Sequence, residues 1–101
     1  MIKEIKENEF IDEVSKSNEN VLVDFYANWC GPCRMLRPVL ESVAKENKDI
    51  KILSIDVDEA ENLAREYEVI SIPCLILFKD GKEVNRSVGL KSIDDIESMI
   101  K

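Results

Sequence analysis

Two cysteines separated by two residues, Cys30 and Cys33, are the side chains of this sequence best suited to covalent chemistry. A thiolate attacks a disulfide through a mixed-disulfide intermediate, and a second thiol nearby can then release the product. The pair follows a strongly apolar stretch and precedes a segment of helical periodicity, so it should lie where a strand joins a helix. This spacing and position favour thiol–disulfide exchange.

Gly31 and Pro32, between the two cysteines, indicate how the helix begins. Proline early in a helix loses nothing by lacking an N–H, and glycine permits a sharp turn and the close approach of another backbone. Cys30 should then lie at the helix N-terminus with Cys33 about one turn later, near enough to close a disulfide. A helix terminus stabilises a nearby anion by ~0.3–1 kcal/mol, and by about 2 in partly buried sites. Since one pKa unit is ~1.4 kcal/mol, the dipole accounts for about one unit of thiol acidification.

Asp24 lies within the apolar run Val21–Ala27, where an isolated charge is costly. Burial raises the pKa of a carboxyl toward neutrality, which suits a group that exchanges protons. The chain has no His, so Asp24 is the best-placed base for deprotonating Cys33. The alternative is a surface-facing strand position with a hydrogen-bonded carboxylate.

The three cysteines and the absence of His limit the other site classes. Ser-His and Cys-His nucleophile pairs are excluded, and three cysteines cannot form a complete set of disulfides within one chain. A zinc site needs about four ligands, so one built on Cys30, Cys33 and Cys74 would require a carboxylate or a second copy of the chain. We therefore expect no metal.

An excess of acid, 21 carboxylates against 14 basic residues for a net charge of −7, disfavours binding to nucleic acids and anionic membranes. The basic residues are scattered among the acidic ones, as on a solvated surface. No apolar run approaches the ~18 residues of a membrane span. The opening residues show no export signal, so we expect a cytoplasmic protein.

Periodicity predicts five strands, at residues 2–6, 21–27, 50–57, 75–78 and 83–88. It also predicts four helices: one with Phe10, Ile11 and Val14 on one face, one from Met35 to Ala44 that Pro38 should kink, one capped by Asp58, and one that starts at Ser92 and buries Ile93, Ile96 and Ile100. Strand–helix alternation followed by a hairpin at Asp80-Gly81 predicts a three-layer α/β/α sandwich with a mixed sheet, as a single domain over residues 1–101.

One set of motifs runs nearly end to end along the sequence: Val23–Ala27, Trp29–Cys33, Pro38, Ile72-Pro73, Phe78–Gly81 and Val88-Gly89. In these motifs the sequence resembles the thioredoxin family. It implies the thioredoxin fold, with Cys30 as the exposed nucleophile, Cys33 as the resolving thiol and Asp24 as the buried acid. Gly31 and Pro32 would tune the redox pair. Pro73 would be a cis-proline beside the disulfide.

The resemblance also implies how substrates bind. The backbone of Ile72 would pair with an extended substrate segment, and Trp29, Pro73 and Gly89 would border an apolar docking surface. The alternatives are plain core packing for Trp29 and a turn for Gly89.

The implied activity is that of a monomeric protein-disulfide reductase, recharged by a thioredoxin reductase or an equivalent electron donor, with no cofactor beyond its own disulfide. Its substrates would be disulfide-containing proteins. Two other functions fit the same fold: an oxidant or isomerase, and a binding module that does not use its thiols. Gly-Pro between the cysteines favours the reductant, since oxidising relatives tend to have His there.

Two positions depart from the family pattern. Ile52 stands where many bacterial relatives have a buried Lys near the acid, and Lys51 should face the other way, so Asp24 should hold its proton more firmly. Cys74 stands where Thr is common. It is either a small half-buried residue at a strand start or an extra thiol for an alternative disulfide or a glutathione adduct.

Overall fold

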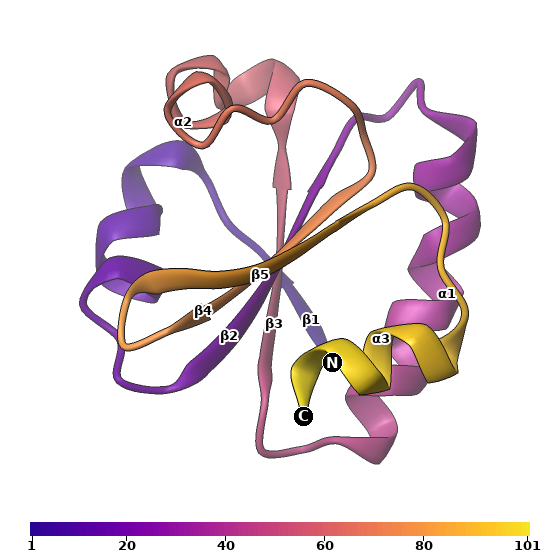
Figure 1. Ribbon diagram of the computed structural model, residues 1–101. Coiled ribbons are helices and arrows are strands. Elements are labelled where there is room, and N and C mark those ends of the chain that lie inside the picture. Colours follow the sequence, from indigo (N-terminus) through magenta and orange to yellow (C-terminus); the bar gives the residue numbers. More distant parts are fainter.

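The computed structural model describes residues 1–101 and contains one five-stranded sheet. Its strands are β1 (Ile2–Glu4), β2 (Asn20–Tyr26), β3 (Lys51–Asp56), β4 (Cys74–Lys79) and β5 (Lys82–Val88), and their order across the sheet is β1-β3-β2-β4-β5 (Figure 1). β3 pairs in parallel with both β1 and β2, whereas β4 pairs antiparallel with β2 and β5. The predicted mixed sheet of five strands is confirmed.

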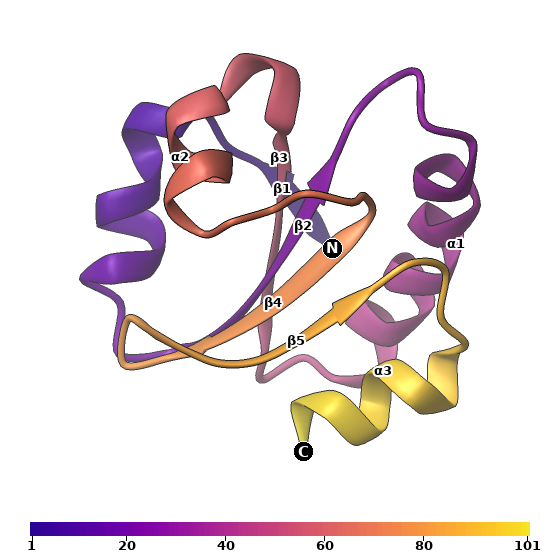
Figure 2. The ribbon, with the colours of Figure 1, turned by 45° about the horizontal axis from the view of Figure 1, so that its top comes forward.

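Helices cover both faces of this sheet. The α-helices are α1 (Gly31–Glu46), α2 (Glu61–Glu66) and α3 (Ile93–Ile100); shorter elements are the 3₁₀ turns η1 (Glu7–Glu9) and η3 (Val57–Glu59) and the π-helical segment η2 (Ile11–Ser15). α1 and α3 lie on one side, and η1, η2 and α2 lie on the other (Figures 1 and 2). The three-layer α/β/α sandwich is therefore confirmed.

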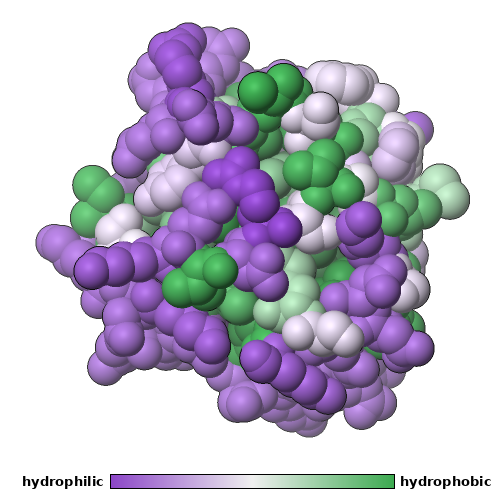
Figure 3. All heavy atoms as spheres, viewed as in Figure 1, coloured by the Kyte–Doolittle hydropathy of each residue, from purple (hydrophilic) through white to green (hydrophobic).

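Strand β2 is the centre of the sheet and is covered on both faces, as its apolar run predicts. Val23 and Phe25 pack in a cluster with Phe10 and with residues of η2 and α2, while Leu22 packs in a second cluster with α1 and α3. Because side chains alternate along a strand, Asp24 shares the face of Leu22 and is directed toward α1. Hydrophilic residues cover much of the outer surface in the view of Figure 3, and apolar residues form separate small groups between them.

The first helical segment was expected to place Phe10, Ile11 and Val14 on one buried face, and the structure differs from this expectation. Phe10 and Val14 are buried, but Ile11 is exposed. Residues 11–15 form a π-helical turn, in which Phe10 and Val14 still lie on one side while the residue after Phe10 turns outward. The prediction for Ile11 was wrong for this reason.

Two further helix predictions need correction, and one is confirmed. Asp58 does not cap α2: it lies within η3, where its N–H donates to the carboxylate of Asp56, and α2 begins only at Glu61. Ser92 caps α3 by accepting a hydrogen bond from the N–H of Asp95 at 3.1 Å, as predicted. Ile93 is exposed rather than buried; on this short helix Ile96 and Ile100 are buried, and Met99 packs partly against the same cluster.

The Asp80-Gly81 turn joins β4 to β5 as predicted. Both residues have positive φ, 51° and 77°, as a two-residue hairpin turn matched to strand twist requires. A Cβ at Gly81 would also collide with the carbonyl group of Ser15. Glycine is therefore required here by both conformation and space.

Candidate active site

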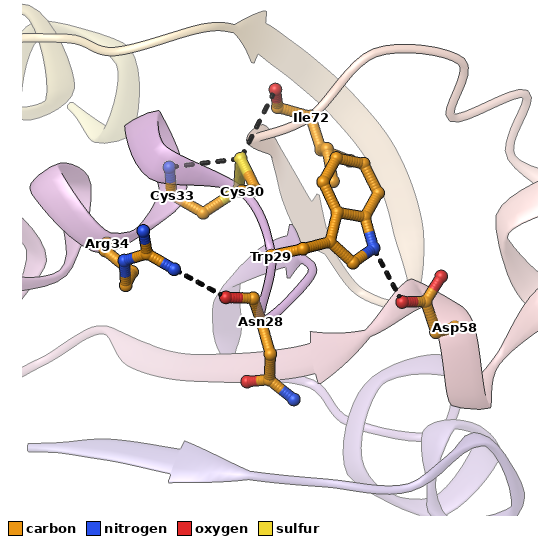
Figure 4. Close-up of a disulfide and its surroundings, with 7 residues drawn as sticks. All are labelled: Asn28, Trp29, Cys30, Cys33, Arg34, Asp58 and Ile72. Atoms are coloured by element: carbon orange, nitrogen blue, oxygen red, sulfur yellow. Dashed lines mark hydrogen bonds between the residues drawn. A yellow bond between two sulfur atoms is a disulfide. The ribbon is translucent and has the colours of Figure 1, made fainter.

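Cys30 and Cys33 form a disulfide at the front of α1, with Cα atoms 5.3 Å apart (Figure 4). Cys30 is the N-cap residue, with extended backbone (φ −86°, ψ 112°), and Pro32 lies in the first turn. The N–H of Cys33 donates to Cys30 Sγ at 3.2 Å, so the sulfur occupies the place of a capping oxygen. The predicted position of the pair, between a strand and a helix, is confirmed.

The disulfide is less accessible than the resemblance implies. Cys30 is only 5% exposed, hardly more than Cys33 at 4%, so Cys30 is not the exposed member of the pair. The reason is that Tyr26, Val57 and Ile72 pack around the two cysteines. Cys30 Sγ lies 3.9 Å from the carbonyl oxygen of Ile72, to which a reduced thiol can donate (Figure 4).

The segment before β4 contains Ile72 and Pro73, and the pairing of β4 with β5 brings Gly89, the residue after β5, next to them. The Ile72–Pro73 peptide bond is cis, as the resemblance implies. The N–H of Gly89 donates to the carbonyl oxygen of Pro73 at 2.8 Å, and Gly89 has a positive φ of 94°. Open space lies where a Cβ of Gly89 would be, so a bound chain can approach its backbone closely.

Trp29 lies directly before the disulfide and is 68% exposed, so the alternative of core packing for this residue is wrong. Its indole Nε1 donates to a carboxylate oxygen of Asp58 at 2.8 Å (Figure 4). Asp58 therefore orients the tryptophan ring rather than capping a helix. On the other side of the disulfide, Arg34 donates to the carbonyl oxygen of Asn28 at 2.8 Å.

Asp24 is 1% exposed, and its Oδ1 has no hydrogen-bond partner. The alternative of a surface-facing carboxylate is therefore wrong. Burial raises the pKa of Asp24 to about 7; the positive charge of Arg37 opposes this rise in pKa and the negative charge of Glu4 adds to it. The predicted shift toward neutrality is confirmed, and burial is its main cause.

A cavity of about 280 Å³ joins Asp24 to Cys33. Glu4, Asp24, Tyr26, Ala27, Asn28, Cys33, Arg34 and Arg37 line it. The acid and the second cysteine predicted from the sequence thus share one space.

Several polar groups of this cavity were not predicted, among them Arg37, Glu4 and the hydroxyl of Tyr26. Arg37 Nη1 donates to the hydroxyl of the buried Ser54 at 2.7 Å, and the Tyr26 hydroxyl donates to Glu4 at 2.8 Å. Arg37 follows Cys33 by four residues on α1, so helical spacing already places it on the same face as Cys33. Glu4 has no comparable signal, because it comes near Asp24 only through the pairing of strands.

The expectation that the adjacent strand places no lysine beside Asp24 is confirmed. Ile52 is buried on the α1 face of β3, and Lys51 faces away, where its Nζ lies 3.2 Å from a carboxylate oxygen of Glu13. Strand β3 therefore supplies no positive charge. Arg37 supplies one from α1 instead.

Cys74 is fully rather than half buried, in the cluster with Phe25 and Ile76 on the sheet face opposite α1. Burial raises the pKa of its thiol, which makes it less reactive. No group of three or more His, Cys, Asp or Glu side chains is placed to hold a metal ion. None of the helices has the length and apolar character needed to cross a membrane.

Comparison with known proteins agrees with this geometry. The family model described as Thioredoxin matches residues 1–101. The chain is 49% identical over 100 residues to the thioredoxin of Chlamydia trachomatis serovar D (99% of this chain, 96% of the relative). It is 40% identical over 100 residues to the thioredoxin of Mycoplasmoides gallisepticum (99% and 100%). It is also 47% identical over 89 residues to the bifunctional thioredoxin reductase/thioredoxin of Mycobacterium leprae (87% of this chain, 19% of the relative).

Fold, redox pair and relatives agree with one another. The chain belongs to the thioredoxin family, and it is a thiol–disulfide oxidoreductase whose redox group is its own Cys30–Cys33 pair.

Proposed function

We propose that the chain reduces protein disulfides with Cys30 as the attacking thiolate and Cys33 as the resolving thiol. Cys30 attacks one sulfur of a substrate disulfide, which breaks that bond and releases the other sulfur as a thiolate that takes up a proton. Cys33 then loses its proton to Asp24 and attacks Cys30 Sγ, which forms the Cys30–Cys33 disulfide and breaks the bond from Cys30 to the substrate. The second substrate sulfur leaves as a thiolate and takes up a proton. The substrate leaves with two thiols, and two electrons have passed from the cysteine pair to it.

The observation that carries this assignment is the hydrogen bond from the N–H of Cys33 to Cys30 Sγ. A helix N-terminus presents N–H groups and a positive end to the capping atom, so it stabilises the charged form of Cys30. Cys33 is the third residue of α1, and its sulfur does not cap the helix. This asymmetry supports Cys30 as the nucleophile, with Gly31 and Pro32 forming the turn that presents it.

The role of Asp24 rests on its shared cavity with Cys33. A group that accepts a proton in one half of a redox cycle and returns it in the other works best with a pKa near the operating pH. The pKa of Asp24, about 7, meets this condition.

The docking surface for substrates consists of Trp29, Ile72, Pro73 and Gly89. Because the cysteines are nearly buried, a substrate disulfide must approach over Ile72, whose carbonyl oxygen lies beside Cys30 Sγ. An extended substrate segment that pairs with the Ile72 backbone would hold its disulfide in that position.

Partners and location follow from the same reasoning. The relative that unites a thioredoxin reductase with a thioredoxin in one chain supports a reductase as the electron donor here. We propose that the protein acts as a monomer in the cytoplasm. Disulfides in the cytoplasm are usually transient and catalytic. A chain with one redox pair, and with its third cysteine, Cys74, as a buried free thiol, fits that compartment.

The test is insulin reduction, first with dithiothreitol and then with candidate reductases. We expect turnover by the native chain, none by Cys30→Ser, and a stable mixed disulfide with substrate proteins for Cys33→Ser. Cys74→Ala is the matched control and should turn over normally. A reduction potential close to that of oxidising relatives would instead indicate an oxidant or isomerase, and full biological activity of Cys30→Ser would indicate a binding module.

A further inference from the structure

The cavity beside Cys33 is lined by two carboxylates, those of Glu4 and Asp24, and by two guanidiniums, those of Arg34 and Arg37. We propose that Arg37 and Glu4 are opposed positioning residues for the proton of Asp24, Arg37 drawing the carboxyl toward its ionised form and Glu4 keeping it protonated. The inference rests on the proposed role of Asp24 as the proton acceptor for Cys33.

Strand pairing sets the arrangement of these groups. Ser54 on β3 is the register partner of Glu4 on β1 and of Asp24 on β2. The three residues therefore form a row across three neighbouring strands. With about 4.8 Å between strands, the Cα atoms of Glu4 and Asp24 are about 10 Å apart, with Ser54 between them.

Arg37 lies over the middle of this row. Its Nη1 donates to Ser54 Oγ at 2.7 Å, and Ser54 is itself buried. The hydrogen bond fixes the guanidinium above the strand that separates the two carboxylates. Arg37 is thus a counter-ion available to both carboxylates.

Glu4 is held in the row by Tyr26, whose hydroxyl donates to its carboxylate at 2.8 Å. Burial raises the pKa of Glu4, while the bond from Tyr26 and the charge of Arg37 lower it. Of the two carboxylates, Asp24 is more deeply buried and has an Oδ1 without a partner. Asp24 is therefore the group whose protonation responds most to a change in either neighbour.

Other titratable groups near Asp24 act less directly. Arg34 lines the same cavity but donates to the carbonyl oxygen of Asn28. The charge of Asp56 on β3 acts on Glu4 and Tyr26, and Cys74 on β4 is coupled to Asp24 from the other face of the sheet. Cys33 and Cys30 do not titrate while they are joined as a disulfide.

The experiment follows the titration of the Asp24 carboxyl carbon by NMR in the disulfide form of the whole chain. For Arg37→Met we expect its midpoint to rise, and for Glu4→Gln to fall, each by roughly 0.5–1 unit, since charges beyond direct contact shift a pKa by less than the 1–3 units of a close pair. Arg37→Lys keeps the positive charge, so its Asp24 midpoint should lie close to that of the native chain. Arg34→Met removes one positive charge from the same helix and cavity, and it should leave the Asp24 midpoint unchanged.

Opposite shifts distinguish an electrostatic role from a structural one, because general loosening of the cavity would lower the Asp24 pKa in both variants. Midpoints that move together, that stay still, or that respond equally to Arg34→Met overturn the inference. If Arg37→Met fails to fold, Glu4→Gln still decides, since Gln keeps an acceptor for the Tyr26 hydroxyl.

A second readout separates this inference from the proposed function. The rate at which dithiothreitol reduces the Cys30–Cys33 disulfide is measured against pH and corrected for the dithiothreitol thiolate. The fall of this rate as Asp24 loses its proton should move to higher pH in Arg37→Met and to lower pH in Glu4→Gln. If the Asp24 midpoints shift as expected but the rate profile does not follow them, the opposed action of Arg37 and Glu4 on Asp24 stands, and Asp24 is not the proton acceptor.

Discussion

The two faces of strand β2 differ in chemistry although both are buried. Toward η1, η2 and α2, Val23 and Phe25 join a wholly apolar cluster that also contains Cys74. Toward α1, Leu22 is apolar, but the next residue on that face is Asp24, which opens onto the polar cavity beside Cys33. One face is packed for stability, and the other gives up stability by burying Asp24, the proposed proton acceptor.

The comparison also explains why two buried sulfurs differ in function. Cys30 and Cys74 are both nearly inaccessible, so exposure does not distinguish them. Cys30 accepts the N–H of Cys33 at the start of a helix, whereas Cys74 lies within a strand among apolar side chains. Donors that stabilise a thiolate, rather than access to water, therefore separate the reactive sulfur from the inert one.

The largest expected effect is on the redox face. Cys30→Ser should lower the rate of insulin reduction by several orders of magnitude, to that of dithiothreitol alone, because a hydroxyl does not replace the thiolate as nucleophile. Cys74→Ala, on the opposite face, should keep the native rate. Comparable losses in both variants would mean that the two sulfurs do not differ as argued.

A substitution on the apolar face should affect stability alone. Phe78 contacts Phe10 and Tyr67 edge-on, with ring centroids 5.6 and 5.4 Å away. Phe78→Ala should lower the free energy of unfolding by about 3–5 kcal/mol, through lost burial and a residual cavity. Urea denaturation gives the stability, and the exchange rate per folded molecule should be unchanged. A loss of exchange in fully folded Phe78→Ala would show that the two faces are coupled.

Asp24→Asn should stabilise the protein at neutral pH. The pKa of Asp24 rises from 3.8 to about 7 on folding, so the unfolded chain releases this proton first as pH rises. Stability contributed by the protonated carboxyl is complete below pH 4 and is lost up to about pH 7; at about 1.4 kcal/mol per unit this amounts to at most about 4 kcal/mol.

Urea denaturation of both proteins at several pH values measures this effect. The native chain should lose stability between pH 4 and 7 more steeply than Asp24→Asn, and the variant should exchange disulfides more slowly at neutral pH. Parallel pH profiles of stability would contradict the raised pKa.

The smallest effect should come from Cys74. Cys74→Ala removes one buried sulfur and should cost about 1 kcal/mol of unfolding free energy, similar to the loss of a single buried methyl group. Because the thiol is buried and its pKa is raised, mild oxidation of the native protein should produce only the Cys30–Cys33 bridge. Mass mapping that finds a glutathione adduct on Cys74 would establish it as a second redox thiol.

Much of the redox centre was predictable from neighbouring residues. The apolar run before Cys30, the Gly-Pro pair and the helical periodicity after Cys33 place the disulfide at a strand–helix junction, and an acid inside the run predicts a raised pKa. Predictions failed where local pattern does not decide exposure. The cysteines are covered by Ile72, which is far from them in the sequence. Asp58 accepts a hydrogen bond from the Trp29 indole instead of capping α2.

The sequence by itself determined the five strands, the hairpin, the redox pair and the buried acid, because periodicity, caps and turn residues act over a few neighbouring positions. Only the tertiary structure decided which charges surround Asp24. Glu4 and Ser54 lie in one row with Asp24 because strands far apart in the chain pair in the order β1-β3-β2. Arg37 on α1 packs over this row and donates to Ser54. Electrostatic interactions depend on distances through space, and a sequence specifies those only once its strands have paired.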